Sequence, residues 1–261
     1  WFINDSHQLR VSFAETVARP DFRELTESPF VDPVTDAITV GNSGLVPTDI
    51  EHRDIRWEYY PSSSESISVA YFEKEFLNPI EIVLEPGETR RQRLQNALGA
   101  ENRGIEVEGR KELAGLTSWR WLDRITVAAN FSIIESEISL DPEQALSVTN
   151  TNRALQGQSE YIVNVQVEYT DEQRGIESAL VFNTYGERIA TAGLVGNPDV
   201  FEQPFNQLDL IVKKTFEPGL EMEFKVRNIL DESIQFTVGD EVFREFKKGV
   251  GASLSLKYSF F

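Results

Sequence analysis

Apolar and polar residues alternate along most of the chain. In the segment 159–170, for example, Val163, Val165 and Val167 are separated by the polar residues Asn164 and Gln166, so the three valines share one face of an extended strand. Spacing typical of amphipathic helices is hard to find. The pattern predicts an all-β protein with ten strands, at residues 8–17, 50–60, 64–76, 101–113, about 120–136, 159–170, 176–187, 206–217, 220–229 and 250–260.

The connections between these strands alternate between long and short. The long ones are 18–49, 77–100, 137–158, 188–205 and 230–249, and the short ones are 61–63, 114–119, 171–175 and 218–219. In an up-and-down meander this order places every long loop at one rim and every tight turn at the other. Outer-membrane barrels have this asymmetry, so the sequence predicts a transmembrane antiparallel β-barrel. A soluble β-sandwich also alternates and stays open as an alternative.

Aromatic residues gather near the predicted short turns. Such rings prefer the boundary between membrane and water, so we expect them to form an aromatic girdle at the short-turn rim; core aromatics of a sandwich are the alternative. The candidates for the girdle are Tyr59, Trp119, Trp121, Tyr169, Tyr258 and Phe260.

Composition narrows the class of protein further. The net charge of −18 argues against a nucleic-acid partner, because binding phosphates requires a basic surface. The absence of cysteine from these residues excludes disulfides and thiolate metal sites among them. No stretch reaches the roughly 18 apolar residues of a membrane helix, and barrel strands do not need one. The first residues, WFINDSHQLRVSF, do not read as a signal peptide, and we expect a fragment of a longer protein.

Several segments, taken in order, resemble the C-terminal part of the barrel of TonB-dependent outer-membrane receptors. They are ETVARPDFREL at 15–25, GNSGLVPTDI at 41–50, IRWEYYP at 55–61, VAYFEKEFLNPIE at 69–81, GIEVEGRKEL at 104–113, NQLDLIVKKTF at 206–216, VRNILDE at 226–232 and the closing LSLKYSFF. The resemblance spans essentially the whole chain. The family typically ends on an aromatic residue that aligns with Phe260, and this chain adds Phe261.

The resemblance implies a barrel of about 22 strands around a plug domain. Residues 1–261 are then the C-terminal portion of the barrel and supply its last ten strands. The family imports a scarce nutrient such as an iron chelate, cobalamin, an oligosaccharide or a peptide, with energy from the inner-membrane TonB complex, which contacts an N-terminal TonB box. Outer-membrane lipid, lipopolysaccharide and the receptor's own plug are the other implied partners. A soluble acidic adhesin or carbohydrate-binding module, and a passive porin-like pore, are the alternatives.

Arginine and asparagine residues in two long loops are candidates for contact with the nutrient. Guanidinium groups bind anionic ligands or phosphates in a bidentate manner, whereas a solvated loop balanced by Glu81, Glu85 and Glu88 is the simpler interpretation. The candidates are Arg90, Arg91, Arg93, Asn152 and Arg153.

No catalytic or metal-binding arrangement is evident. The two histidines, His7 and His52, lie far apart in sequence, and no resident metal or cofactor is expected. The acidic loop 230–249 has no recognisable calcium-loop spacing. Charged residues on the polar face of the predicted strands are expected to line a hydrated interior and to pair with one another and with a plug.

Overall fold

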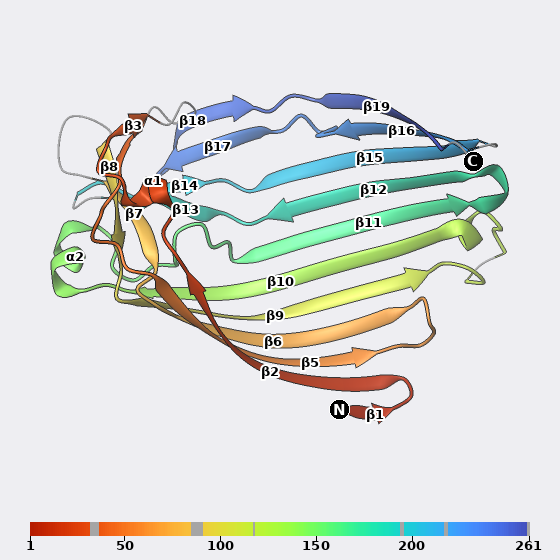
Figure 1. Cartoon of the computed structure of the whole chain (residues 1–261), viewed down its shortest axis with the longest axis horizontal. Helices are drawn as coiled ribbons and strands as arrows, with labels where there is room; N and C mark the ends of the chain where they lie inside the picture. Colours follow the sequence, from red (N-terminus) through yellow and green to blue (C-terminus); the bar gives the residue numbers. More distant parts are fainter. Residues whose placement is uncertain (32–36, 85–90, 117, 194–195, 217–218, 260–261) are drawn as a thin grey trace.

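A computed structural model describes residues 1–31, 37–84, 91–116, 118–193, 196–216 and 219–259. Its main element is one antiparallel sheet of eleven strands, which follow one another in chain order across the sheet (Figure 1). The strands are β1 (Phe2–Asn4), β2 (His7–Ala18), β5 (Thr48–Tyr59), β6 (Ser66–Leu77), β9 (Gly99–Glu112), β10 (Ile125–Ser139), β11 (Tyr161–Asp171), β12 (Ile176–Tyr185), β15 (Phe205–Phe216), β16 (Leu220–Arg227) and β19 (Gly251–Tyr258).

Ten of these strands match the ten predicted from alternation, and β1 is an addition that pairs with the start of β2. One predicted boundary is wrong. Residues Leu122–Arg124 form a 3-10 turn, and β10 begins only at Ile125. Trp119 and Trp121 therefore lie within the connection before β10, which is longer than predicted.

The predicted alternation of connections is confirmed. The described residues of the short turns 60–65, 113–124, 172–175 and 217–219 lie at one end of the sheet, on the right in Figure 1. The described residues of the long connections 19–47, 78–98, 140–160, 186–204 and 228–250 lie at the other end. Because the strands are antiparallel, every second connection returns to the same end. We call these the short-turn end and the long-loop end.

The long connections contain regular secondary structure that was not predicted from the sequence. They contain two four-stranded sheets, ordered β3-β4-β8-β7 and β13-β14-β17-β18, and an isolated parallel bridge between Val83 and Ala192 links them. We call the described residues of the five long connections the loop cap. Its strands are β3 (Phe30–Val31), β4 (Ile38–Val40), β7 (Ile80–Leu84), β8 (Arg91–Asn96), β13 (Arg188–Thr191), β14 (Val200–Glu202), β17 (Ser233–Val238) and β18 (Glu241–Lys247).

Two short helices in the loop cap begin at acidic capping residues. Asp21 accepts hydrogen bonds at the start of α1 (Phe22–Leu25), and Asp141 does so at the start of α2 (Pro142–Ser147). In both cases the third helical residue, Glu24 or Gln144, bonds back to the cap, which satisfies backbone donors that a helix start leaves unpaired. Neither of the described helices is long and apolar enough to cross a membrane.

The faces of the eleven-stranded sheet are inverted relative to a water-soluble sheet. Polar side chains such as Glu58, Ser68 and Ser132 are only 4–6% exposed, whereas Phe13 and Leu254 on the opposite face are 60–62% exposed. We call the polar face the inner face and the apolar face the outer face. Most of the buried apolar side chains lie at the long-loop end, including a cluster of Ala97, Ala100 and Ile138, against which Phe76, Leu140 and Leu155 pack.

Candidate functional site

A row of polar side chains crosses the inner face from strand to strand. Its members are opposite one another in the register of the sheet, so they lie side by side on neighbouring strands. From β5 to β12 the row reads Glu58, Ser68, Glu108, Asn130, Asn164 and Asn183. The sequence shows a polar residue at each position, but only the register brings them into one line.

Ion pairs within the wall neutralise most of the charge beside this row. Arg56 hydrogen-bonds to Glu58 at 3.0 Å and to Glu108 on a neighbouring part of the face. Arg110 on β9 pairs with Glu168 on β11 at 2.8 Å, across the intervening strand β10. The prediction that interior charges pair with one another is thereby confirmed for these residues.

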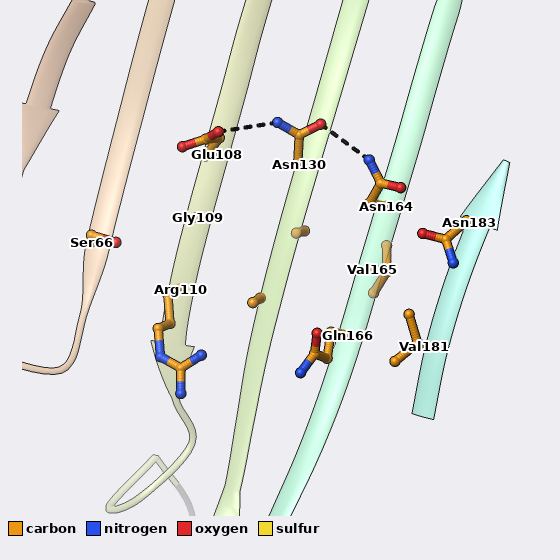
Figure 2. Close-up of a pocket in the computed structure, with 12 residues that line it drawn as sticks. Ser66, Glu108, Gly109, Arg110, Asn130, Asn164, Val165, Gln166, Val181 and Asn183 are labelled. Atoms are coloured by element: carbon orange, nitrogen blue, oxygen red, sulfur yellow. Dashed lines mark hydrogen bonds between the residues drawn. The ribbon is translucent and has the colours of Figure 1, made fainter. Parts of the chain in front are cut away.

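The inner face contains a hollow, which Figure 2 shows. Its volume is about 320 Å³. The side chains around it come from β6, β9, β10, β11 and β12. Its floor is low because Ala128, which lies between Arg110 and Gln166 in the register of the sheet, is small. Its polar lining comprises Ser66, Glu108, Arg110, Asn130, Asn164, Gln166 and Asn183.

At the long-loop end, a buried ion pair joins two loops. Both guanidinium Nη atoms of Arg153 donate to the carboxylate of Glu81, at 2.8 and 2.9 Å, and both side chains are 1% exposed. Nearby, the Ile82 amide donates to the side-chain oxygen of Gln156 at 2.9 Å. These contacts hold residues 152–158 against β7. Two of the long connections of the loop cap are therefore bound to each other.

The predicted ligand candidates fall into different environments. Arg153 is buried in the ion pair, so its guanidinium is occupied by Glu81. The structure thus corrects the expectation that Glu81 balances the arginines of its own loop. Asn152 is exposed beside a pocket of about 440 Å³ between β10 and residues 152–160. Arg91 and Arg93 are exposed on β8, and Arg90 lies outside the described residues.

A second polar cluster stabilises the β13–β14 hairpin of the loop cap. Arg188 and Tyr185 both donate to the carboxylate of Glu202, at 2.8 and 2.7 Å. Burial opposes ionisation of Glu202, but these two hydrogen bonds outweigh it and lower the pKa of this carboxyl below its ordinary value. The ion pair also raises the pKa of Arg188.

The described girdle candidates all lie at or near the short-turn end. Trp119 and Trp121 stack on each other with ring centroids 6.2 Å apart and are 62% and 55% exposed. Tyr59 stacks on His7 at 4.6 Å. The hydroxyl of Tyr169 accepts from Arg124 at 3.1 Å, Tyr258 is 50% exposed at the end of β19, and Phe260 lies outside the described residues.

Within the described part of the chain, no group of three or more histidine or acidic side chains is placed to hold a metal ion. His52 hydrogen-bonds to Thr16 at 2.8 Å, far from the aromatic stack of His7. The acidic residues of the loop 230–249 take separate partners. Asp231 pairs with Lys247, and Glu245 accepts from Gln235.

The distribution of apolar and polar side chains over the two faces of the sheet defines the class of protein. A soluble sheet buries its apolar face and exposes polar residues, and a contiguous apolar surface of this extent is unusual on a soluble monomer. Here the apolar residues point outward and the polar residues inward, with long loops at one end and short turns at the other. This arrangement is the wall of a transmembrane β-barrel.

Comparison with known proteins gives the family. The model of the family described as "TonB dependent receptor-like, beta-barrel" matches residues 1–229. The chain therefore belongs to the TonB-dependent receptor family, as part of its β-barrel. No curated protein sequence matches the chain.

Solved structures with a similar fold include receptors for iron compounds. The siderophore receptor PirA from Acinetobacter baumannii is 15% identical with a TM-score of 0.63, covering 99% of this chain and 40% of its own. The FrpB iron transporter from Neisseria meningitidis is 11% identical with a TM-score of 0.59, covering 98% and 37%. The ferric enterobactin receptor PfeA from Pseudomonas aeruginosa, as a mutant with enterobactin, is 14% identical with a TM-score of 0.57, covering 89% and 34%. The chain thus spans roughly a third to two fifths of their length, and at these identities the likeness shows the fold alone.

Proposed function

We propose that this chain is part of the wall of an outer-membrane receptor that captures a scarce nutrient and imports it with energy from the TonB complex. The observation that carries the proposal is the inverted sheet together with membership in the family. The outer face of Phe13, Trp57, Phe131 and Leu254 would contact lipid, and the polar inner face would line the interior. Burial of so much apolar surface in a bilayer would stabilise the wall.

In this proposal, residues 1–261 supply the C-terminal portion of a barrel of about 22 strands. A plug domain and earlier strands of the same receptor would complete it, and a TonB box would contact the energising complex. The share of the similar receptors that this chain covers, 34–40%, supports this division. Lipid and lipopolysaccharide would surround the outer face.

The nutrient would first meet the loop cap. Among iron chelates, cobalamin, oligosaccharides and peptides, an iron chelate is supported by the similar structures named above, which are siderophore or iron receptors by description. The exposed Arg91, Arg93 and Asn152 are proposed as contacts, with Arg153 holding the loop that carries Asn152. Concave sites of this kind recruit several loops.

Uptake by the full-length receptor tests the proposal. Cells that depend on this receptor should take up a labelled nutrient, such as a ferric siderophore or an oligosaccharide, only when TonB is present. Uptake that continues without TonB would indicate a passive pore. Recovery of the receptor in the aqueous fraction, without detergent, would indicate a soluble β-sandwich and contradict the membrane assignment.

A further inference from the structure

Two carboxylates fix the orientation of the amide groups in the inner-face hollow. The side-chain nitrogen of Asn130 donates to Glu106 at 2.7 Å and to Glu108 at 3.3 Å. An ionised carboxylate only accepts hydrogen bonds, so the nitrogen of Asn130 must face it and the oxygen must face away. That oxygen accepts from the side-chain nitrogen of Asn164 at 3.4 Å (Figure 2). The relay therefore directs the oxygen of Asn164 away from Asn130.

A second amide in the hollow is oriented in the same way. The side-chain nitrogen of Gln166 donates to Glu168 at 2.7 Å, which leaves its oxygen without a hydrogen bond among the described residues. The oxygen of Asn164 has no donor there either. Asn164 and Gln166 are only partly exposed, so neighbouring side chains of the inner face shield their oxygens in part. The hollow consequently presents hydrogen-bond acceptors to whatever enters it.

The cations near the hollow are already neutralised. Arg110 pairs with Glu168, and Arg56 pairs with Glu108. Among the described residues near the hollow, a ligand that carries several negative charges would find amide oxygens and carboxylates, which repel anionic oxygen, and no guanidinium without a carboxylate partner. A ligand with hydroxyl or amide donors would satisfy the same groups. Chains of hydrogen bonds polarise one another, so a carboxylate at the start of the relay strengthens acceptance at its far end.

The size of the hollow suits a small molecule. Its volume of about 320 Å³ falls at the lower end of the range of small-molecule sites, about 300–1,000 Å³. The small side chain of Ala128, between Arg110 and Gln166, gives a ligand access to the side chains around it. The residues that line the hollow belong to strands of the wall. The hollow would therefore contact the nutrient as it passes through the interior of the barrel.

We propose that this hollow binds an uncharged nutrient rich in hydrogen-bond donors, such as an oligosaccharide or a neutral ferric trihydroxamate, and disfavours polyanionic chelates. The proposal rests on the proposed import function. Asn164 and Gln166 act as acceptors. Asn130, with Glu106 and Glu108, orients Asn164, and Glu168 orients Gln166. The hollow would thereby contribute to the choice among the nutrients considered above.

The test uses the full-length receptor in detergent and three probes: maltohexaose, a neutral ferric trihydroxamate and an anionic ferric tricatecholate. Titration calorimetry should detect at least one neutral probe. Asn164→Ala and Gln166→Ala should each weaken its binding by about 3–10-fold, the size expected for one hydrogen bond. Gln8→Ala is the matched control, because Gln8 is an amide on the same row of the inner face but outside the hollow. It should leave the affinity unchanged.

Three outcomes would overturn the inference. The first is equal binding of the neutral probes to Asn164→Ala, Gln166→Ala and the unaltered receptor. The second is binding in which only the tricatecholate depends on the two amides. The third is a change in the hydrogen exchange of the plug alone, which would assign the hollow to a polypeptide contact. A receptor that imports no nutrient in cells would instead contradict the proposed function, so the two failures are distinguishable.

Discussion

Replacing Arg153 with alanine is expected to loosen the loop cap without unfolding the barrel wall. The substitution leaves the carboxylate of Glu81 buried at 1% exposure with its cation removed. Removing one partner of a buried ion pair costs about 3–5 kcal/mol, because the remaining charge is uncompensated. Glu81 and Arg153 belong to different loops, so the cost falls on the contact between residues 152–158 and β7.

Hydrogen exchange of single amides measures this local opening. The amides of Ile82 and Ile138 report on it, because they bond to Gln156 and Arg153 respectively. A loss of about 3–5 kcal/mol corresponds to exchange that is faster by about 10²–10⁴-fold. Amides in the middle of β11 should keep their protection.

A matched control separates the effect of burying an unpaired charge from the effect of losing an ion pair. Arg103→Ala removes an ion pair of similar length, 3.0 Å to Glu135, whose side chains are 51% and 72% exposed. Exposed pairs contribute about 0–1 kcal/mol, so this variant should change exchange by less than about 10-fold. The double variant Glu81→Leu with Arg153→Met should recover most of the protection, since apolar replacements remove both buried charges. Exchange in Arg153→Ala within threefold of the unaltered receptor would refute the reasoning.

Three further predictions concern the lipid face, the girdle and the loop cap. Phe224→Arg should lower the stability of the barrel in lipid by about 2–4 kcal/mol if the site lies near the bilayer midplane, while Phe224→Leu should not; equal denaturation midpoints would contradict the outer facing. Fluorescence of Trp119 and Trp121 should be quenched most by lipids brominated near the headgroup, and strongest quenching from the bilayer centre would contradict a girdle. The lowered pKa of Glu202 means that its stabilisation of the hairpin is present above pH 4.5 and is lost as pH falls through the lower folded-state pKa. Protection of the Arg188 amide should fall there, and Glu202→Gln should abolish this pH dependence.

The strands of the wall were predictable because their alternation is local. Val163 and Val165 share a face whatever the partner strand is, and the order of short and long connections fixed the two ends. The boundary of β10 was not predictable, because the turn at Leu122 reads as a continuation of the strand. The sheets of the loop cap were missed since their strands are short and pair across long separations, as β4 does with β8 and β14 with β17.

The candidate site was harder to predict from the sequence than the strands of the wall. Arg153 has the residue type of a ligand contact, but its partner Glu81 lies 72 residues away in sequence. The alignment of Asn130, Asn164 and Asn183 depends on the register of two strand pairs, which a single sequence does not specify. The signal available in the sequence was an asparagine within each of three successive predicted strands. That these asparagines lie side by side becomes evident only when the strands are paired in register.

The account depends most on the inverted facing of the wall, and spin labels on β11 test it directly. Single cysteines can be introduced in turn at positions 161–167 of the full-length receptor, after removal of any native cysteines, and the receptor placed in lipid vesicles. Collision rates of the labels with oxygen, which concentrates in the bilayer, should rise and fall with a period of two. Maxima at Val163 and Val165 and minima at Asn164 and Gln166 are predicted. Maxima at Asn164 and Gln166, or no periodicity, would contradict a transmembrane wall with this orientation.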